Sequence, residues 1–179
     1  MKVIVIIVAI VMFLVLLVGG SCFYLVHRAR HEFSKAMQVP AYSGKREPCA
    51  MLTSDEASSA LGQPVNSAEP FGTAVCRYSY GAEGRQLNVQ YTWQGGAIAM
   101  GVTQKVMQHM SNVGSFTPVE GIGDDALLGP MGSTLMMRKG DVLVNMDLRA
   151  SGVSADAAEK MARMIADHLR DSAAGEFRP

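Results

Sequence analysis

The chain has 179 residues with 16 basic and 16 acidic side chains, so its formal net charge at neutral pH is zero. Four of the basic residues but only one of the acidic residues precede residue 38, which leaves the rest of the chain mildly acidic. Because a phosphate backbone requires a basic protein face, this balance argues against nucleic acid as a partner.

The first 26 residues are the most apolar part of the chain. Residues 3–26 contain no charged side chain, and residues 3–18 are all apolar. A helix of this length rises about 36 Å, enough to cross a hydrocarbon core of about 30 Å. We predict a transmembrane signal-anchor helix over 1–26, with the lipid bilayer as its partner. Two alternatives stay open: cleavage near the small residues at 19–21, and lipidation of Cys22, although Gly19 stands where lipoprotein signals usually carry a bulky aliphatic residue.

Two observations disagree about the orientation of this anchor. Arg28, Arg30 and Lys35 follow the apolar segment, whereas Lys2 precedes it, so the positive-inside rule favours a cytoplasmic C-terminus. An early lysine before a long apolar core is instead typical of an export signal, and the cysteines favour an oxidising compartment. We predict a single-pass protein of the cell membrane with its C-terminal domain outside the cytoplasm, and keep the reversed anchor as the alternative.

Residues 27–48 are predicted to be a helical juxtamembrane stalk and a linker. No helix breaker occurs from 27 to 38, and Val39 should leave helical space because it precedes Pro40. Residues 39–48 then have the composition of a linker. His27 and His31 are four residues apart and could share a metal ion, but no cysteine or carboxylate completes a site, so contact with lipid headgroups is the better interpretation.

The predicted domain spans 49–172, followed by a flexible tail over 173–179. Its size matches one ordinary domain. Thr53 and Glu56 form a capping-box pattern that starts a helix over 53–61, and Gly62 suits its end. Two alternating segments, 75–80 and 86–93, predict a hairpin with one apolar, aromatic face. Its other face is neutral and polar, with Gln86, Asn88, Gln90 and Thr92.

The second half of the domain repeats this order of strands and then a helix. A helix over 97–113 is predicted to pack on the sheet through Ile98, Val102, Val106, Met110 and Val113. Strands follow at 127–128, 133–138 and 142–148, and Ser154 caps a last helix over 154–171. We predict an α+β fold with one antiparallel sheet, helices packed on one side, and a weak internal pseudo-repeat. The inward positions of the last helix are Ala158, Met161, Ile165 and Leu169.

The cysteines outside the predicted anchor are Cys49 and Cys76. A disulfide between them would close a loop of about 27 residues, contribute about 3 kcal/mol and tie the first helix to the sheet. We predict this bond, and the alternative is two buried free thiols in a cytoplasmic domain. No cysteine or histidine spacing is typical of zinc sites.

Three short motifs stand out along the domain: Cys49–Ala57, Cys76–Tyr78 and Gly121–Ala126. With them, about residues 48–170 resemble a bacterial family of anchored or lipoprotein-type extracytoplasmic domains of unknown function. It implies a bond between Cys49 and Cys76 and an α+β fold outside the cytoplasm, and it implies no activity. The chain departs from the family at its anchor, because many relatives carry a clear lipidation motif.

Gly121–Ala126 also fits the dinucleotide pattern G-x-G-x-x-A. The residues after it, including Gly129 and Pro130, cannot open a helix, and Asp124 and Asp125 would occupy the place of the pyrophosphate. We predict a turn capped by the aspartates. A calcium site at Asp124 and Asp125 is an alternative, although the spaced oxygen ligands of such loops are missing.

Thirteen methionines suggest a second metal alternative. Met107, His109 and Met110, or Met136 and Met137, could hold Cu(I) as soft ligands, but adaptable filling of the core explains the methionines better. His168 is predicted to interact with the C-terminal end of the last helix.

No G-x-S-x-G, H-E-x-x-H or P-loop motif occurs in the sequence. We therefore predict a non-enzymatic domain without cofactor, catalytic or metal residues. It would offer a sheet face or groove to an envelope protein or a small ligand. A copper- or calcium-binding envelope protein and a cytoplasm-facing domain are the alternatives.

Overall fold

The computed structural model describes residues 39–109 and 116–174, and of residues 107–109 and 170–174 it describes the backbone alone. The predicted membrane helix over 1–26 and the stalk up to residue 38 lie outside the described residues, as does the end of the predicted tail. Within the described ranges, no helix is both long and apolar enough to cross a membrane.

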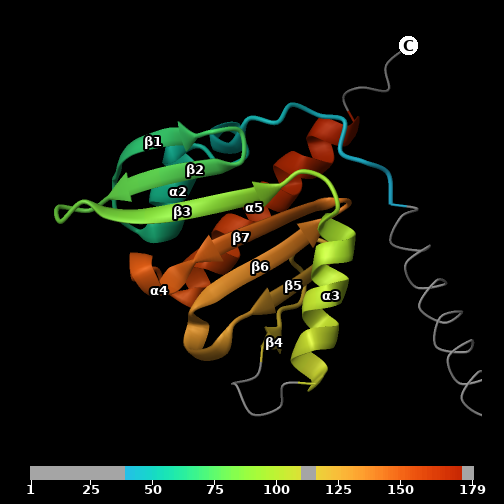
Figure 1. The fold of residues 1–179 in the computed structure, drawn as a ribbon. Coiled ribbons are helices and arrows are strands. Elements are labelled where there is room, and N and C mark those ends of the chain that lie inside the picture. Colours follow the sequence, from blue (N-terminus) through green and yellow to red (C-terminus); the bar gives the residue numbers. More distant parts are fainter. Residues whose placement is uncertain (1–38, 110–115, 175–179) are drawn as a thin grey trace, which may run out of the picture. The chain divides into compact units, whose positions relative to one another are not determined.

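The domain is built on a single antiparallel sheet of seven strands (Figure 1). The strand order is β1-β2-β3-β7-β6-β5-β4, so two meanders meet where β3 pairs with β7. The α+β prediction is confirmed. The strands are β1 (Val65–Phe71), β2 (Val75–Tyr80), β3 (Arg85–Thr92), β4 (Thr117–Pro118), β5 (Asp125–Leu128), β6 (Thr134–Lys139) and β7 (Val142–Asp147).

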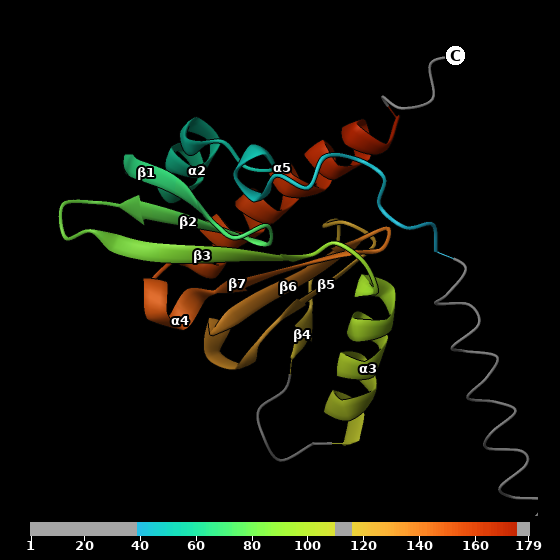
Figure 2. The ribbon, with the colours of Figure 1, turned by 45° about the horizontal axis from the view of Figure 1, so that its top comes forward.

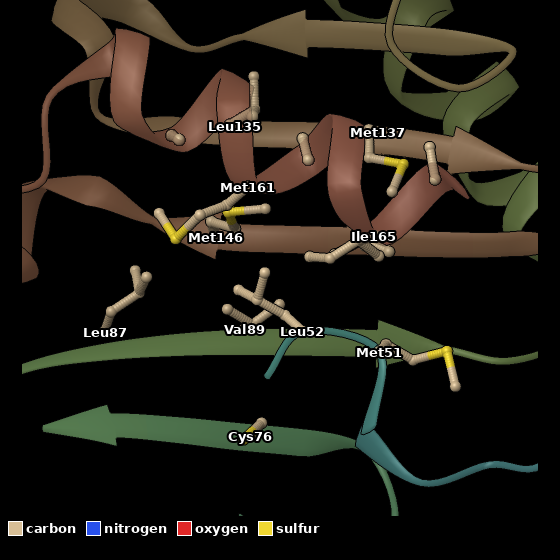
Figure 3. Close-up of a cluster of buried hydrophobic side chains, with 14 of the residues drawn as sticks. Met51, Leu52, Cys76, Leu87, Val89, Leu135, Met137, Met146, Met161 and Ile165 are labelled. Atoms are coloured by element: carbon tan, nitrogen blue, oxygen red, sulfur yellow. The ribbon is translucent and has the colours of Figure 1, made fainter. Parts of the chain in front are cut away.

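The main core lies between one face of this sheet and the helices α2 (Ser54–Leu61) and α5 (Ala155–Ala174). Figure 3 shows Met161 of α5 next to Met146 of β7, with Ile165 of the same helix farther along and Leu87 and Val89 of β3 on the other side. All five side chains are fully buried. Methionine therefore fills the core here, as its flexible, polarizable side chain allows.

Helix α3 (Gly96–His109) packs against the opposite face of the sheet, mainly on β6 and β7 (Figures 1 and 2). Leu143 alternates with the core residues Val142 and Val144, and together with Met100 of α3 it belongs to a separate apolar cluster. The prediction that all helices lie on one side is therefore wrong. The predicted contact face of this helix is wrong as well, because Val102 and Val106 are 56% and 49% exposed.

Asp141 in the β6–β7 turn fixes the start of α3. Its carboxylate accepts hydrogen bonds from the backbone N–H groups of Gly95 and Ala97, and its carbonyl accepts one from Gly96. A Cβ atom on Gly96 would lie 2.6 Å from both the Asp141 carbonyl oxygen and the Leu143 nitrogen. The glycine therefore lets the helix start directly against the sheet backbone.

The position of α3 also limits the predicted pseudo-repeat. Because β3 and β7 are antiparallel neighbours, a twofold axis that relates the two meanders must stand perpendicular to the sheet. Such an axis would place α3 and α5 on the same face, but they lie on opposite faces. An internal repeat could therefore relate the strands of the two meanders but not the helices that follow them.

The domain begins earlier than predicted. Tyr42, in the predicted linker, is 8% exposed, and its ring stacks on Trp93 at 5.4 Å between centroids. A short 3-10 helix, η1 (Pro48–Ala50), then leads into α2, whose capping box at Thr53 and Glu56 is formed as predicted. The compact unit starts at Val39.

The remaining predicted elements match the structure. The 75–80 and 86–93 hairpin is formed by β2 and β3, and α5 has a hydrogen bond from Ala157 N–H to the Ser154 hydroxyl at its start. The four predicted inward positions of α5 are at most 3% exposed. Two further helical segments are α4 (Leu148–Ser151) and η2 (Pro130–Gly132).

Candidate functional site

The face of β1–β3 that points away from the main core forms the open half of the sheet. On β3 every second residue faces this side and is exposed, including Gln86, Asn88 and Gln90, as the hairpin pattern predicts. The described helices on this face are limited to α3, which packs mainly on β6 and β7. A shallow hollow of about 390 Å³ occupies the centre of this open half.

Two neighbouring rows of side chains line the hollow. In the first row, strand pairing aligns Phe71 with Val75, Val75 with Gln90, and Gln90 with Asn145. This row therefore crosses four strands from β1 to β7. In the second row Arg77 is aligned with Asn88, and Asp147 completes the lining.

Arg77 organises the β1 side of the hollow. Its guanidinium carbon lies 5.2 Å from the centroid of the Phe71 ring, a cation–π contact. Its Nε–H donates a hydrogen bond of 3.2 Å to Oδ1 of Asn88. Since arginine has no acceptor atom, this bond fixes the orientation of the Asn88 amide and leaves its NH₂ group to donate elsewhere.

The β7 side of the hollow is organised by two short contacts. The Thr134 hydroxyl lies 2.8 Å from Oδ1 of Asn145 and 2.9 Å from the Met146 carbonyl oxygen, so it restricts the position of the Asn145 side chain. Asp147 is the N-cap of α4, where Oδ1 accepts a hydrogen bond from Ala150 N–H at 3.3 Å. The hollow thus offers amide, guanidinium, carboxylate and aromatic groups at defined positions, which is a set for binding by hydrogen bonds.

A second, larger hollow of about 580 Å³ lies beside the Gly121–Asp125 loop, between that loop and α3. Its aspartates are engaged with basic groups. Asp124 accepts hydrogen bonds from Lys139 Nζ at 2.9 Å and Gly140 N–H at 2.7 Å, and Asp125 accepts one from Arg138 Nε at 2.9 Å. Two cations therefore stand where a calcium ion would have to bind.

These contacts also set the ionisation of Asp124. Partial burial alone would raise the pKa of its carboxyl group. The hydrogen bonds from Lys139 and Gly140 and the charges of Lys139 and Arg138 outweigh that effect and lower the pKa below its ordinary value. The ionised aspartate is the stable form in this turn.

The Gly121–Ala126 motif forms the predicted turn. It connects β4 to β5, so a strand follows the glycines and the helix required for dinucleotide binding is missing here. A Cβ atom on Gly123, whose φ is +59°, would lie 2.3 Å from the Arg138 carbonyl oxygen. This glycine therefore serves the close packing of the turn against β6.

The candidate copper ligands whose side chains the structure describes do not come together. Met136 and Met137 are neighbours on β6, so they point to opposite faces: Met137 lies in the main core and Met136 against the α3 cluster. The side chains of Met107, His109 and Met110, as well as His27 and His31, lie outside the described set. In the part of the chain that the structure describes, no group of three or more His, Cys, Asp or Glu side chains could hold a metal ion.

The predicted cysteine pair is confirmed. Cys49 and Cys76 form a disulfide that links η1 to β2. Cys76 lies on the face of the sheet that contacts the main core. Nε2 of His168 on α5 lies 3.1 Å from Oε1 of Glu56 on α2, a contact between the last and the first helix that the sequence analysis did not predict.

Comparisons with known proteins gave no relative: no protein-family model, curated protein or solved structure matches this chain. The site must therefore be interpreted from its own geometry.

The sequence identified two of the seven residues that line the hollow. Asn88 and Gln90 belong to the polar strand face predicted from alternation, whereas Phe71, Asn145 and Asp147 were not assigned to a site. Phe71 lies on β1, which the sequence analysis missed because Val65–Phe71 lacks alternation and contains Pro70. The pairing of β3 with β7, which brings Asn145 beside Gln90, is a long-range contact without a local sequence signal.

Proposed function

We propose that this chain is a membrane-anchored protein whose domain lies outside the cytoplasm and binds an envelope component, without catalysing a reaction. The observation that carries the binding function is the organised polar hollow on the open half of the sheet. The residues that line this hollow supply hydrogen-bonding groups and no nucleophile or acid–base pair, a lining that suits an anchored domain to recognition. The resemblance to anchored extracytoplasmic domains agrees with this proposal.

Two features support the location. Residues 3–26 form an uncharged segment long enough to span a bilayer. The bonded pair Cys49 and Cys76 is typical of proteins in oxidising compartments, because cytosolic thiols are kept reduced.

Labelling of a new cysteine in intact cells tests the location. Ala82 is exposed in the β2–β3 turn, so an Ala82→Cys variant in a Cys22→Ser background carries one accessible thiol when the disulfide is formed. We expect a membrane-impermeant maleimide to label it in intact cells, while the Cys22→Ser parent stays unlabelled. Labelling that requires cell lysis would place the domain in the cytoplasm and establish the reversed anchor.

Position-specific photo-crosslinking in intact cells tests the binding face. A photoreactive amino acid at Gln90 lies in the hollow, and the same group at Lys160 lies on the exposed side of α5 as a matched control. We expect adducts from position 90 alone, and their loss when Arg77→Ala removes the group that orients the hollow. Equal adducts from both positions, or adducts that persist with Arg77→Ala, would refute binding through this face.

A further inference from the structure

We propose that the hollow on the open half of the sheet binds an uncharged oligosaccharide, a segment of an envelope glycan. This inference rests on the proposed function and names the ligand class of the same site. It depends on the residue types that line the hollow, on how the protein orients them, and on their spacing across the strands.

The polar groups of the hollow match the hydrogen bonds that sugars form. A sugar hydroxyl donates and accepts at once, so it is best met by groups that offer both functions or pair a donor with an acceptor. The carboxamides of Asn88, Gln90 and Asn145 each offer a donor and an acceptor, while Arg77 donates and Asp147 accepts. One positive and one negative group among the lining residues leave no net charge, which disfavours phosphate-rich or strongly charged ligands.

The aromatic ring of the hollow supplies an apolar platform. The Phe71 side chain is 66% exposed, although the large aromatic residues of this domain are otherwise mostly buried. The Arg77 guanidinium lies 5.2 Å from the ring centroid, a cation–π contact that favours this position of the ring. An exposed aromatic ring beside oriented amides can stack against the C–H face of a pyranose ring, which buries apolar surface on both partners.

The geometry of the sheet suits an extended polymer. Strands are spaced by about 4.8 Å, comparable with the length of one sugar residue in an extended chain. The row from Phe71 to Asn145 crosses three such gaps, a span of about 14 Å. A segment of about three sugar residues can therefore lie across the strands with one row of side chains beneath it.

The orientation of the polar groups before binding favours affinity for a flexible ligand. Asn88 is held by Arg77 at 3.2 Å, and Asn145 is held by Thr134 at 2.8 Å. Binding then costs less side-chain entropy than at a surface of unrestrained amides. Of the residues that line the hollow, Asp147 alone is a carboxylate, so the pair of acids used by most glycosidases is absent from this lining and the glycan is expected to stay intact.

Isothermal titration calorimetry on the full chain tests this proposal, in a detergent without a sugar headgroup so that the detergent cannot compete. The probes are β-linked tetrasaccharides of glucose and of N-acetylglucosamine, with a neutral tetrapeptide as the competing ligand class. We expect at least one tetrasaccharide to bind with a dissociation constant between about 1 μM and 1 mM. Mass spectrometry should recover it uncleaved.

Three variants locate the binding. Phe71→Ala and Asn88→Ala should each weaken binding at least about tenfold, a loss of about 1.4 kcal/mol. Gln86→Ala is the matched control, because Gln86 is exposed on the same face of β3 but does not line the hollow. All three residues are exposed, so circular dichroism should show unchanged folding.

Three results would overturn the inference: no binding of either tetrasaccharide up to about 10 mM, binding that Phe71→Ala and Asn88→Ala leave unchanged, or binding of the tetrapeptide alone. If photo-crosslinking from position 90 still depends on Arg77 in these cases, the binding function stands and the glycan assignment fails. If that crosslinking fails as well, the proposed function falls with it.

Discussion

Loss of the Cys49–Cys76 disulfide should destabilise the domain by an amount that the loop length sets. The bond closes a loop with a sequence separation of 27 residues. Without the bond the unfolded chain gains conformational entropy, and this alone should lower the free energy of unfolding by about 3–4 kcal/mol. For a domain of this size, which unfolds with a free energy of about 5–15 kcal/mol, the midpoint of thermal unfolding should fall by about 10 °C.

The loss of stability should also differ between parts of the domain. Without the bond, η1 and the segment before α2 remain attached through the buried Met51 and Leu52 and the stacking of Tyr42 on Trp93. We therefore expect amide hydrogen exchange to rise in residues 39–53 before it rises in α5.

The assay is thermal unfolding of the full chain in detergent, followed by circular dichroism. Three samples suffice: the oxidised protein, the same protein after reduction, and a Cys49→Ala/Cys76→Ala variant. Reduction should lower the midpoint of the native protein and leave that of the double variant unchanged. An equal midpoint before and after reduction would refute the reasoning, because the loop length predicts a loss of about 3–4 kcal/mol in the free energy of unfolding when the bond is broken.

Two of three further predictions compare matched positions, and the third concerns the pH dependence of stability. Gly96→Ala should destabilise the domain by about 1–3 kcal/mol in urea unfolding, because its Cβ meets backbone at 2.6 Å, whereas Gly101→Ala on the same helix meets nothing within 4 Å and should stabilise by about 0.5–1 kcal/mol. Tyr78→Phe should cost about 1–2 kcal/mol because the hydroxyl donates a 2.6 Å hydrogen bond to the Leu52 carbonyl. Tyr91→Phe should be neutral or stabilising in the same assay, because the buried Tyr91 hydroxyl has no hydrogen-bond partner among the described residues. The lowered pKa of Asp124 stabilises the fold above the ordinary carboxyl value of 3.8, and this contribution is lost as the pH falls through the folded pKa. Asp124→Asn should therefore reduce the loss of stability below about pH 4, and an unchanged acid profile would contradict this.

The parts of the fold that the sequence predicted correctly have local physical signals. Thr53 and Glu56 satisfy each other's free backbone amides within a single turn, so a stretch of four residues is enough to locate the helix start. The β2–β3 hairpin and α5 have one buried and one exposed side, and the period of their apolar residues reports that difference directly.

The face of α3 could not be determined in the same way. From Gly96 to Val102 the helix consists of apolar residues and glycine, so several faces are apolar and the period leaves the contact face undefined. The face is chosen instead by Asp141, which holds the first turn of the helix against the β6–β7 turn. That contact joins residues more than 40 positions apart and has no signal in the local pattern.

The same contact explains why half of the sheet stays open. Asp141 and Gly96 fix the start of α3 at the β6–β7 turn. The helix therefore covers the apolar cluster around Leu143 on the second meander, β4–β7. The outward side chains of β3 are polar, so leaving them in water costs little. On the neighbouring strands Val75 and the exposed Phe71 ring also line the hollow, and the ring contacts Arg77. A single exposed aromatic ring is common on protein surfaces, so it is the position of this ring beside the oriented amides of the hollow that favours a ligand.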